Sequence, residues 1–185
     1  MKAGRPEAVK LVVSLLTGDP TLFSAAATRL KERFGEPDLV SEPFEFGRTD
    51  YYEEELGGGL RRKLLAFDGL MDPGELAGIK LFTNGVEAEY SAEGRRRINI
   101  DPGYMALEKF VLASCKNFSH RIYIGSGVYA ETTLIYEGKG FKTLEWTYPD
   151  YGAAQMKALL LEVRRRLSLR LGRSTGRSGG PAAKA

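Results

Sequence analysis

The first part of the chain carries two clear hydrophobic patterns. Residues 9–16 are apolar almost without interruption, which is typical of a buried strand. Asp19 and Pro20 then supply an N-cap and a first helical residue, and apolar side chains recur at helical spacing from Phe23 to Phe34. The pattern predicts a strand followed by an amphipathic helix that ends at Gly35.

The same helix-start signal returns at residues 72–75, where an aspartate, a proline and a glutamate stand in N-cap order. The apolar stripe behind it runs from Leu76 to Tyr90 and predicts a helix that ends by Gly94. A last stripe predicts a helix over residues 153–171. Between these helices, apolar and alternating runs predict strands over 39–46, 60–68, 97–101, 120–124, 128–136 and 141–147. Residues 106–115 fit a strand or a helix, and the run Phe-Val-Leu at 110–112 favours a strand.

The order of these elements predicts an α+β fold. The first 101 residues read strand, helix, strand, strand, helix, strand, which is the order of a ferredoxin-like βαββαβ core. Turns at residues 125–127 and 137–140 join the last strands into an antiparallel β-meander that extends this core, together with the C-terminal helix. We expect one globular domain over residues 1–171 and a disordered, basic Gly/Ser/Ala-rich tail over residues 172–185.

The distribution of charge argues against a strong nucleic-acid-binding domain. The formal net charge is +3, and the predicted tail holds Arg173, Arg177 and Lys184 and no acid, so the predicted domain is formally neutral. A neutral domain lacks the field that draws proteins to phosphate backbones, so we expect only weak, tail-dependent nucleic-acid binding.

Hydropathy and cysteine usage indicate a cytoplasmic protein. No apolar run approaches the roughly 18 residues that a membrane helix needs, and the first residues lack the apolar segment of a signal peptide. The single cysteine, Cys115, excludes an internal disulfide. Its place in a predicted buried strand favours an inert small hydrophobe over a reactive thiol.

Polar side chains interrupt the strand near residue 101. Because side chains alternate along a strand, Asn99 and Asp101 share one face, while the isoleucines beside them point to the core. A carboxylate and an amide held at a strand end suit a hydroxyl, an ammonium or a metal. The alternative is that Asp101 caps a turn made by the Pro-Gly pair at 102–103.

The only histidine begins one strand of a predicted hairpin. With three loop residues, Arg121 lies directly opposite Glu131; with two, Ile122 takes that place, and His120 and Glu131 become diagonal neighbours. An Arg–Glu pair would be structural, whereas a histidine oriented by Glu131 is a candidate general base. A satisfied core histidine is the alternative.

Residues 50–55 are acidic and aromatic, and glycines 57–59 follow them. This segment predicts a lid over a polar ligand, with a solvated loop as the alternative.

We predict that these three polar segments form one shared site. Its catalytic candidates are His120, Asp101 and Glu131, and its ligand-binding candidates are Asp50, Tyr52, Glu53, Asn99 and Arg121. The sequence leaves any cofactor unknown, and a divalent metal on Asp101, Glu131 and an acid of residues 50–55 is an open alternative.

Several phrases of the sequence also form a joint pattern. They include Asn-Ile-Asp-Pro-Gly-Tyr at 99–104, His-Arg-Ile-Tyr at 120–123 and Trp-Thr-Tyr-Pro-Asp-Tyr at 146–151, with shorter phrases at 9–11, 18–20, 49–53, 67–73, 79–80 and 83–84. Over about residues 8–151 the chain resembles the prokaryotic family called domain of unknown function 4416. The resemblance implies no established activity and no catalytic residue.

These patterns leave the reaction unknown, and whether the chain is an enzyme stays open. The leading hypothesis is a small cytoplasmic enzyme or ligand-binding domain for a polar small molecule, phosphorylated or nucleotide-like. One alternative is a nucleic-acid-binding module that presents Tyr123, Tyr129 and Trp146 to single-stranded bases. The other is a non-catalytic, partner-binding subunit.

Overall fold

A computed structural model describes residues 2–46, 56 and 58–172 of the chain. The strands are β1 Val9–Thr17, β2 Pro37–Val40, β3 Phe44–Glu45, β4 Arg61–Met71, β5 Asn99–Met105, β6 Lys109–Ser114, β7 Ile122–Gly125, β8 Val128–Glu137 and β9 Gly140–Thr143. The helices are α1 Pro20–Phe34, α3 Leu76–Glu89, α4 Pro149–Gly152 and α5 Ala154–Arg170, with a 3-10 turn at Pro73–Glu75.

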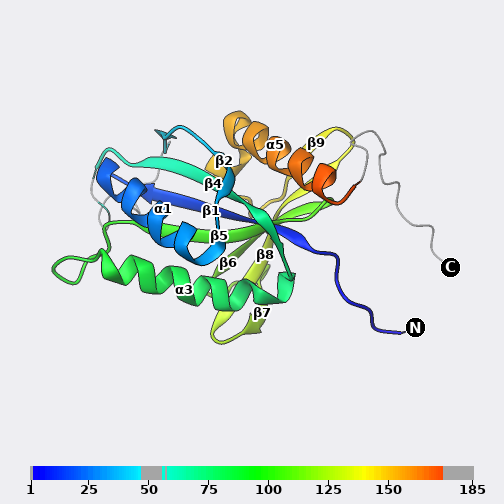
Figure 1. Ribbon diagram of the computed structural model, residues 1–185, viewed down its shortest axis with the longest axis horizontal. Helices are drawn as coiled ribbons and strands as arrows, with labels where there is room; N and C mark the ends of the chain where they lie inside the picture. Colours follow the sequence, from blue (N-terminus) through cyan, green and yellow to red (C-terminus); the bar gives the residue numbers. More distant parts are fainter. Residues whose placement is uncertain (1, 47–55, 57, 173–185) are drawn as a thin grey trace.

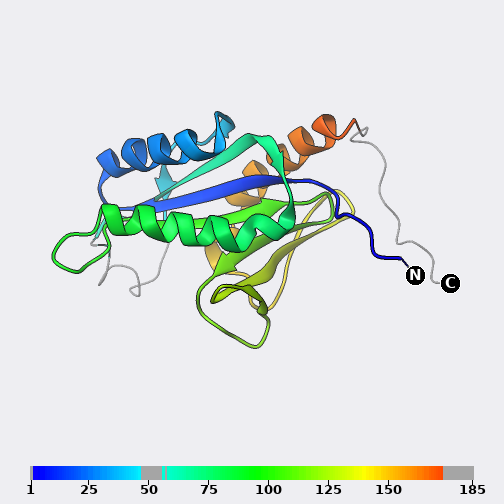
Figure 2. The same ribbon diagram turned by 60° about the horizontal axis from the view of Figure 1, so that its bottom comes forward.

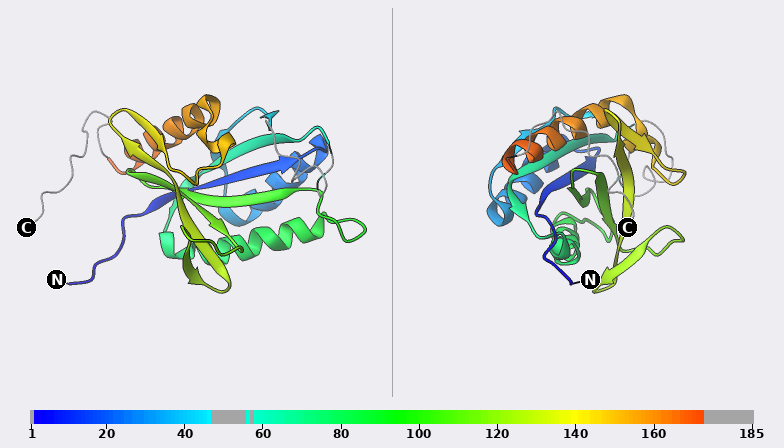
Figure 3. Two further views of the ribbon diagram at one scale, coloured as in Figure 1. Left: turned by 180° about the vertical axis from the view of Figure 1, so that it is seen from behind. Right: turned by 90° about the vertical axis from the view of Figure 1, so that its right-hand side faces the viewer.

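One large antiparallel sheet dominates the molecule. Its nine strands follow the order β2-β4-β1-β5-β6-β8-β7, with β3 paired to β4 and β9 paired to β8 (Figures 1 and 3). The ferredoxin-like core with a separate meander extension is therefore wrong as a description of the fold. β6 pairs directly with both β5 and β8, so the predicted meander is continuous with the first strands in a single sheet. Periodicity predicts strands but not which strands share a sheet.

Helices cover both faces of the sheet. α1 and α3 pack on the face of β1 that carries Leu11, Val13 and Leu15 (Figure 2). α5 packs on the opposite face, where Val12 of β1 and Leu64 of β4 lie. Both faces of β1 are thus buried, which explains why its sequence is mostly apolar. In the described part of the chain, no helix has the length and apolarity needed to cross a membrane.

The Pro-Gly pair at 102–103 does not turn the chain, as one alternative expected. Pro102 pairs with Val13 of β1, and Gly103 pairs with Leu112 of β6, so β5 continues through both residues to Met105. A Cβ on Gly103 would collide with the carbonyl oxygen of Val111. The glycine therefore permits the close approach of β6, and tertiary packing overrides the local turn preference.

Two other predicted strands are shorter than expected. The run over 39–46 is broken near Pro43 into β2 and β3, and both pieces pair with β4. β9 ends at Thr143, because side chains then replace the backbone ladder: the Trp146 indole donates to the Thr132 carbonyl at 2.8 Å, and the Thr147 hydroxyl donates to the Thr133 carbonyl at 2.6 Å. The predicted tail lies outside the described residues from position 173 onward.

Candidate functional site

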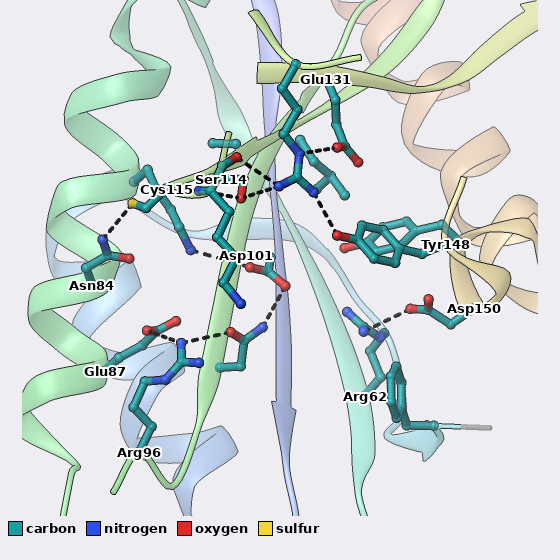
Figure 4. Close-up of a pocket in the computed structure, with 18 of the residues that line it drawn as sticks. Arg62, Asn84, Glu87, Arg96, Asp101, Ser114, Cys115, Glu131, Tyr148 and Asp150 are labelled. Carbon is teal, nitrogen blue, oxygen red and sulfur yellow. Dashed lines mark hydrogen bonds and ion pairs between the residues drawn. The ribbon is translucent and has the colours of Figure 1, made fainter. Parts of the chain in front are cut away.

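A cavity of about 670 Å³ opens between α3, the facing ends of β5 and β6, and the segment that leads into α5 (Figure 4). Its lining is rich in charge. The basic side chains that line it are Arg62, Lys80, Arg96, Lys116 and Arg121. The acidic side chains that line it are Glu87, Asp101, Glu131 and Asp150. Each of the four acids is paired with one of these bases, so ion pairs make up much of the wall.

The first pair joins α3 to β5. Lys80 is only 6% exposed, and its Nζ donates to the carbonyl oxygen of Ile100 at 3.0 Å and lies 3.4 Å from Oδ1 of Asp101. The amide of Asn99 donates to the other oxygen of Asp101 at 2.6 Å. Asn99 and Asp101 do share a face, as predicted, and Asp101 is held by Lys80 and Asn99 rather than by a turn.

The second pair lies on the neighbouring stretch of wall. Oε1 of buried Glu87 accepts a hydrogen bond from the Ile100 amide at 2.5 Å, and its Oε2 accepts one from Arg96 at 3.1 Å. Arg96 also donates to the side-chain oxygen of Asn99 at 3.3 Å. Burial raises the pKa of Glu87 above its ordinary value, although the charges of Lys80 and Arg96 and the Ile100 amide oppose this.

Glu87→Gln is expected to change how stability depends on pH. Because the folded protein holds the Glu87 proton more tightly than the unfolded chain does, the carboxylate costs folding free energy once it ionises. The free energy of unfolding of the wild type, relative to the variant, should fall as pH rises from 4.5 through the raised pKa, and stay level above it. Urea denaturation at a series of pH values measures this difference.

Glu89→Gln on the same helix provides a control of opposite sign. A hydrogen bond from Arg29 lowers the pKa of Glu89, so the wild type should gain stability over this variant as pH rises from the lowered pKa toward 4.5. Equal pH profiles for the two variants would contradict the assignment of a burial penalty to Glu87.

Arg121 is the centre of the opposite wall. Its Nε donates to Oε2 of Glu131 at 2.7 Å, and its two terminal nitrogens donate to the Ser114 hydroxyl at 3.1 Å, the Lys116 carbonyl at 2.9 Å and the Tyr148 hydroxyl at 2.8 Å. Burial tends to lower the pKa of Arg121, but Glu131 and Tyr148 outweigh it and raise that pKa. One guanidinium thus ties β6, β8 and the segment before α4 together.

His120 shares the same carboxylate. Its Nε2 lies 2.9 Å from Oε2 of Glu131, and its ring stacks on Trp146 with centroids 5.0 Å apart. The hairpin closes with two loop residues, and an irregularity in the pairing between Tyr123 and Gly125 restores the register expected for three. Glu131 therefore meets both His120 and Arg121, the contacts that the two predicted registers offered separately.

A third group closes the cavity beside β4. Arg62 is 3% exposed, hydrogen-bonded to Ser14 and paired with Asp150 at 2.8 Å. Its guanidinium lies 4.9 Å from the ring centroid of Phe46 and 5.2 Å from that of Tyr151. Burial raises the pKa of the Tyr151 hydroxyl. Arg62 thus links strands β1 and β4 to helix α4.

The structure brings together most of the predicted site. Asn99, Asp101, Arg121 and Glu131 line one cavity, while His120 does not line it and reaches it only through Glu131. The predicted residues Asp50, Tyr52 and Glu53 lie outside the described residues. Among the residues that the structure describes, no three His, Cys, Asp or Glu side chains are grouped so that they could hold a metal ion.

Sequence reasoning missed several residues that line the cavity. Arg62 stands two positions before Leu64 on β4, so alternation places it on an inward face of the predicted strand. Glu87 follows Thr83 by one helical turn on the buried face of α3. A charge on an inward position was the available signal in both cases.

Cys115 was also placed wrongly. It lies just beyond the end of β6, it is exposed, and it lines the cavity instead of filling a buried strand. Its sulfur accepts a hydrogen bond from the Asn84 amide at 3.3 Å. Alkylation of this thiol can therefore report whether the cavity is occupied.

Fold and cavity together define an antiparallel-sheet protein with helices on both faces and an ion-paired cavity at one end of its central strands. The chain belongs to the family described as domain of unknown function (DUF4416), whose sequence profile matches residues 7–167. This confirms the resemblance seen in the sequence. No curated protein and no solved structure matches the chain.

Proposed function

We propose that the cavity binds a small polar molecule that carries an anionic group, of the phosphorylated or nucleotide-like class. The observation that carries this proposal is the convergence of bases from four separate segments on one cavity. Arg62 comes from β4, Lys80 from α3, Arg96 from the segment before β5, and Lys116 and Arg121 from the loop between β6 and β7. Its volume of about 670 Å³ also falls in the usual range for small-molecule sites.

The ion pairs support binding because they orient the bases in advance. Carboxylates hold three of the bases in place: Asp101 holds Lys80, Glu87 holds Arg96, and Glu131 holds Arg121. These basic side chains therefore lose little conformational freedom when a ligand binds. The basic residues in the lining outnumber the acidic ones, which favours an anion over a cation. Tyr148, which is 43% exposed at the cavity, offers a ring for a sugar or base to stack against.

Arg96→Gln is expected to weaken binding of a phosphorylated ligand about ten- to a hundredfold, since a charge-assisted hydrogen bond contributes roughly 1.5–3 kcal/mol. Nucleotides, sugar phosphates and inorganic phosphate would be screened by thermal shift, because a ligand of the native state raises the melting temperature by mass action. Titration calorimetry on the compounds that bind then gives the ratio of dissociation constants.

Arg97→Gln is the matched control. Arg97 is the next residue, but it pairs with Asp19 at 2.6 Å and does not line the cavity, so its loss should leave affinity unchanged. Alkylation of Cys115 locates the binding event, because the chain has one cysteine and it lines the cavity. A bound ligand should slow that alkylation. Equal losses in both arginine variants, or alkylation that no binding compound slows, would refute the proposal.

A further inference from the structure

The Glu131 carboxylate is bound asymmetrically. The residue is 3% exposed, and both of its nitrogen partners, Nε2 of His120 and Nε of Arg121, lie on one oxygen, Oε2, at 2.9 and 2.7 Å. The other oxygen, Oε1, is buried and has no hydrogen-bond partner among the residues that the structure describes. Buried carboxylate oxygens are normally satisfied, so this one needs an explanation.

The surroundings hold the carboxylate in this asymmetric state. Arg121 is fixed by Ser114, the Lys116 carbonyl and Tyr148, and the His120 ring is stacked against Trp146. Rotating the carboxylate to satisfy Oε1 would break contacts to two donors that are themselves held in place. Because Glu131 lines the cavity (Figure 4), a group inside the cavity is the candidate partner for this oxygen.

We infer that Oε1 of Glu131 accepts a hydrogen bond from a hydroxyl group of the ligand, so that the ligand is a phosphorylated polyol, such as a sugar phosphate or the ribose phosphate part of a nucleotide. This inference rests on the proposed function and adds the second recognition element to it. A hydroxyl fits better than an ammonium, because the bases in the lining outnumber the acids and Arg121 adjoins Glu131. Glu131 is then a ligand-binding residue, and His120 and Arg121 are positioning residues.

The test compares ribose 5-phosphate with inorganic phosphate on two variants. In Glu131→Gln, the amide oxygen can keep the contacts to His120 and Arg121, while the amide nitrogen replaces the charged acceptor Oε1. We expect ribose 5-phosphate to bind this variant about tenfold more weakly, and inorganic phosphate to bind it as it binds the wild type. Glu137→Gln on the same strand is the control, since Glu137 is exposed and pairs with Lys142.

The single histidine gives an independent readout. In the wild type, ribose 5-phosphate should shift the nuclear magnetic resonance signals of the His120 ring, because both groups share the Glu131 carboxylate, and inorganic phosphate should leave them in place. A melting curve checks that Glu131→Gln is folded.

The possible results distinguish a failure of this inference from a failure of the proposed function. If the wild type binds neither probe nor any other phosphorylated compound, the proposed function fails, and the inference falls with it. If the wild type binds both probes but Glu131→Gln weakens both equally or neither, the cavity binds phosphate, and only the assignment of a hydroxyl to Glu131 is wrong.

Discussion

Arg121→Met is expected to lower the free energy of unfolding by about 3–5 kcal/mol, the usual result of removing one partner from a buried ion pair. The Arg121 side chain is 8% exposed, and its guanidinium is bonded to Glu131, Ser114, Tyr148 and the Lys116 carbonyl. Methionine fills a similar volume but leaves the Glu131 carboxylate buried beside His120 alone. Urea denaturation with a linear fit measures the loss.

Two further variants show whether the uncompensated charge of the Glu131 carboxylate causes that loss. The double variant Arg121→Met with Glu131→Gln should be less destabilised than the sum of the two single variants, because the uncompensated charge is gone. Arg165→Met should have little effect, since Arg165 is half exposed and pairs with Glu162 on its own helix. Additive single effects would mean that Arg121 acts through packing and not through charge.

Gly103→Ala is the second substitution with a large expected effect. The added Cβ would collide with the Val111 carbonyl oxygen and lie 3.0 Å from a methyl group of Leu112. Because one of these neighbours is backbone in a paired strand, β5 and β6 must separate, and we expect a loss of about 3 kcal/mol in the free energy of unfolding. Thermal and urea denaturation both measure it.

Gly78→Ala tests the same change where space is free. Gly78 is exposed within α3, and an added Cβ would meet nothing within 4 Å. Alanine is about 0.8–1 kcal/mol better than glycine inside a helix, so this variant should gain stability. A Gly103→Ala protein as stable as the wild type would show that β6 does not approach β5 as closely as described.

Local signals in the sequence determined the helices. The Asp19 carboxylate accepts a hydrogen bond from the Thr21 amide at 2.9 Å, Pro20 begins α1, and Gly35 follows the helix with a φ of 83°. Each of these contacts joins residues a few positions apart, so the residue types alone suffice to predict them. The shared face of Asn99 and Asp101 was predictable for the same reason, because alternation along a strand is local.

The single sheet and the cavity were decided by contacts between residues far apart in the chain. Whether residues 102–103 turn or continue β5 depends on β6, which needs a glycine at its point of closest approach. The meeting of Glu131 with both His120 and Arg121 depends on a pairing irregularity in the β7–β8 hairpin that no local pattern specifies. Local pattern can place Arg62 on an inward face, but it does not identify the carboxylate that pairs with it, because that partner, like the partner of Lys80, comes from another segment of the chain. A buried charge is tolerated only when such a partner compensates its lost hydration, and the tertiary structure alone brings the two together.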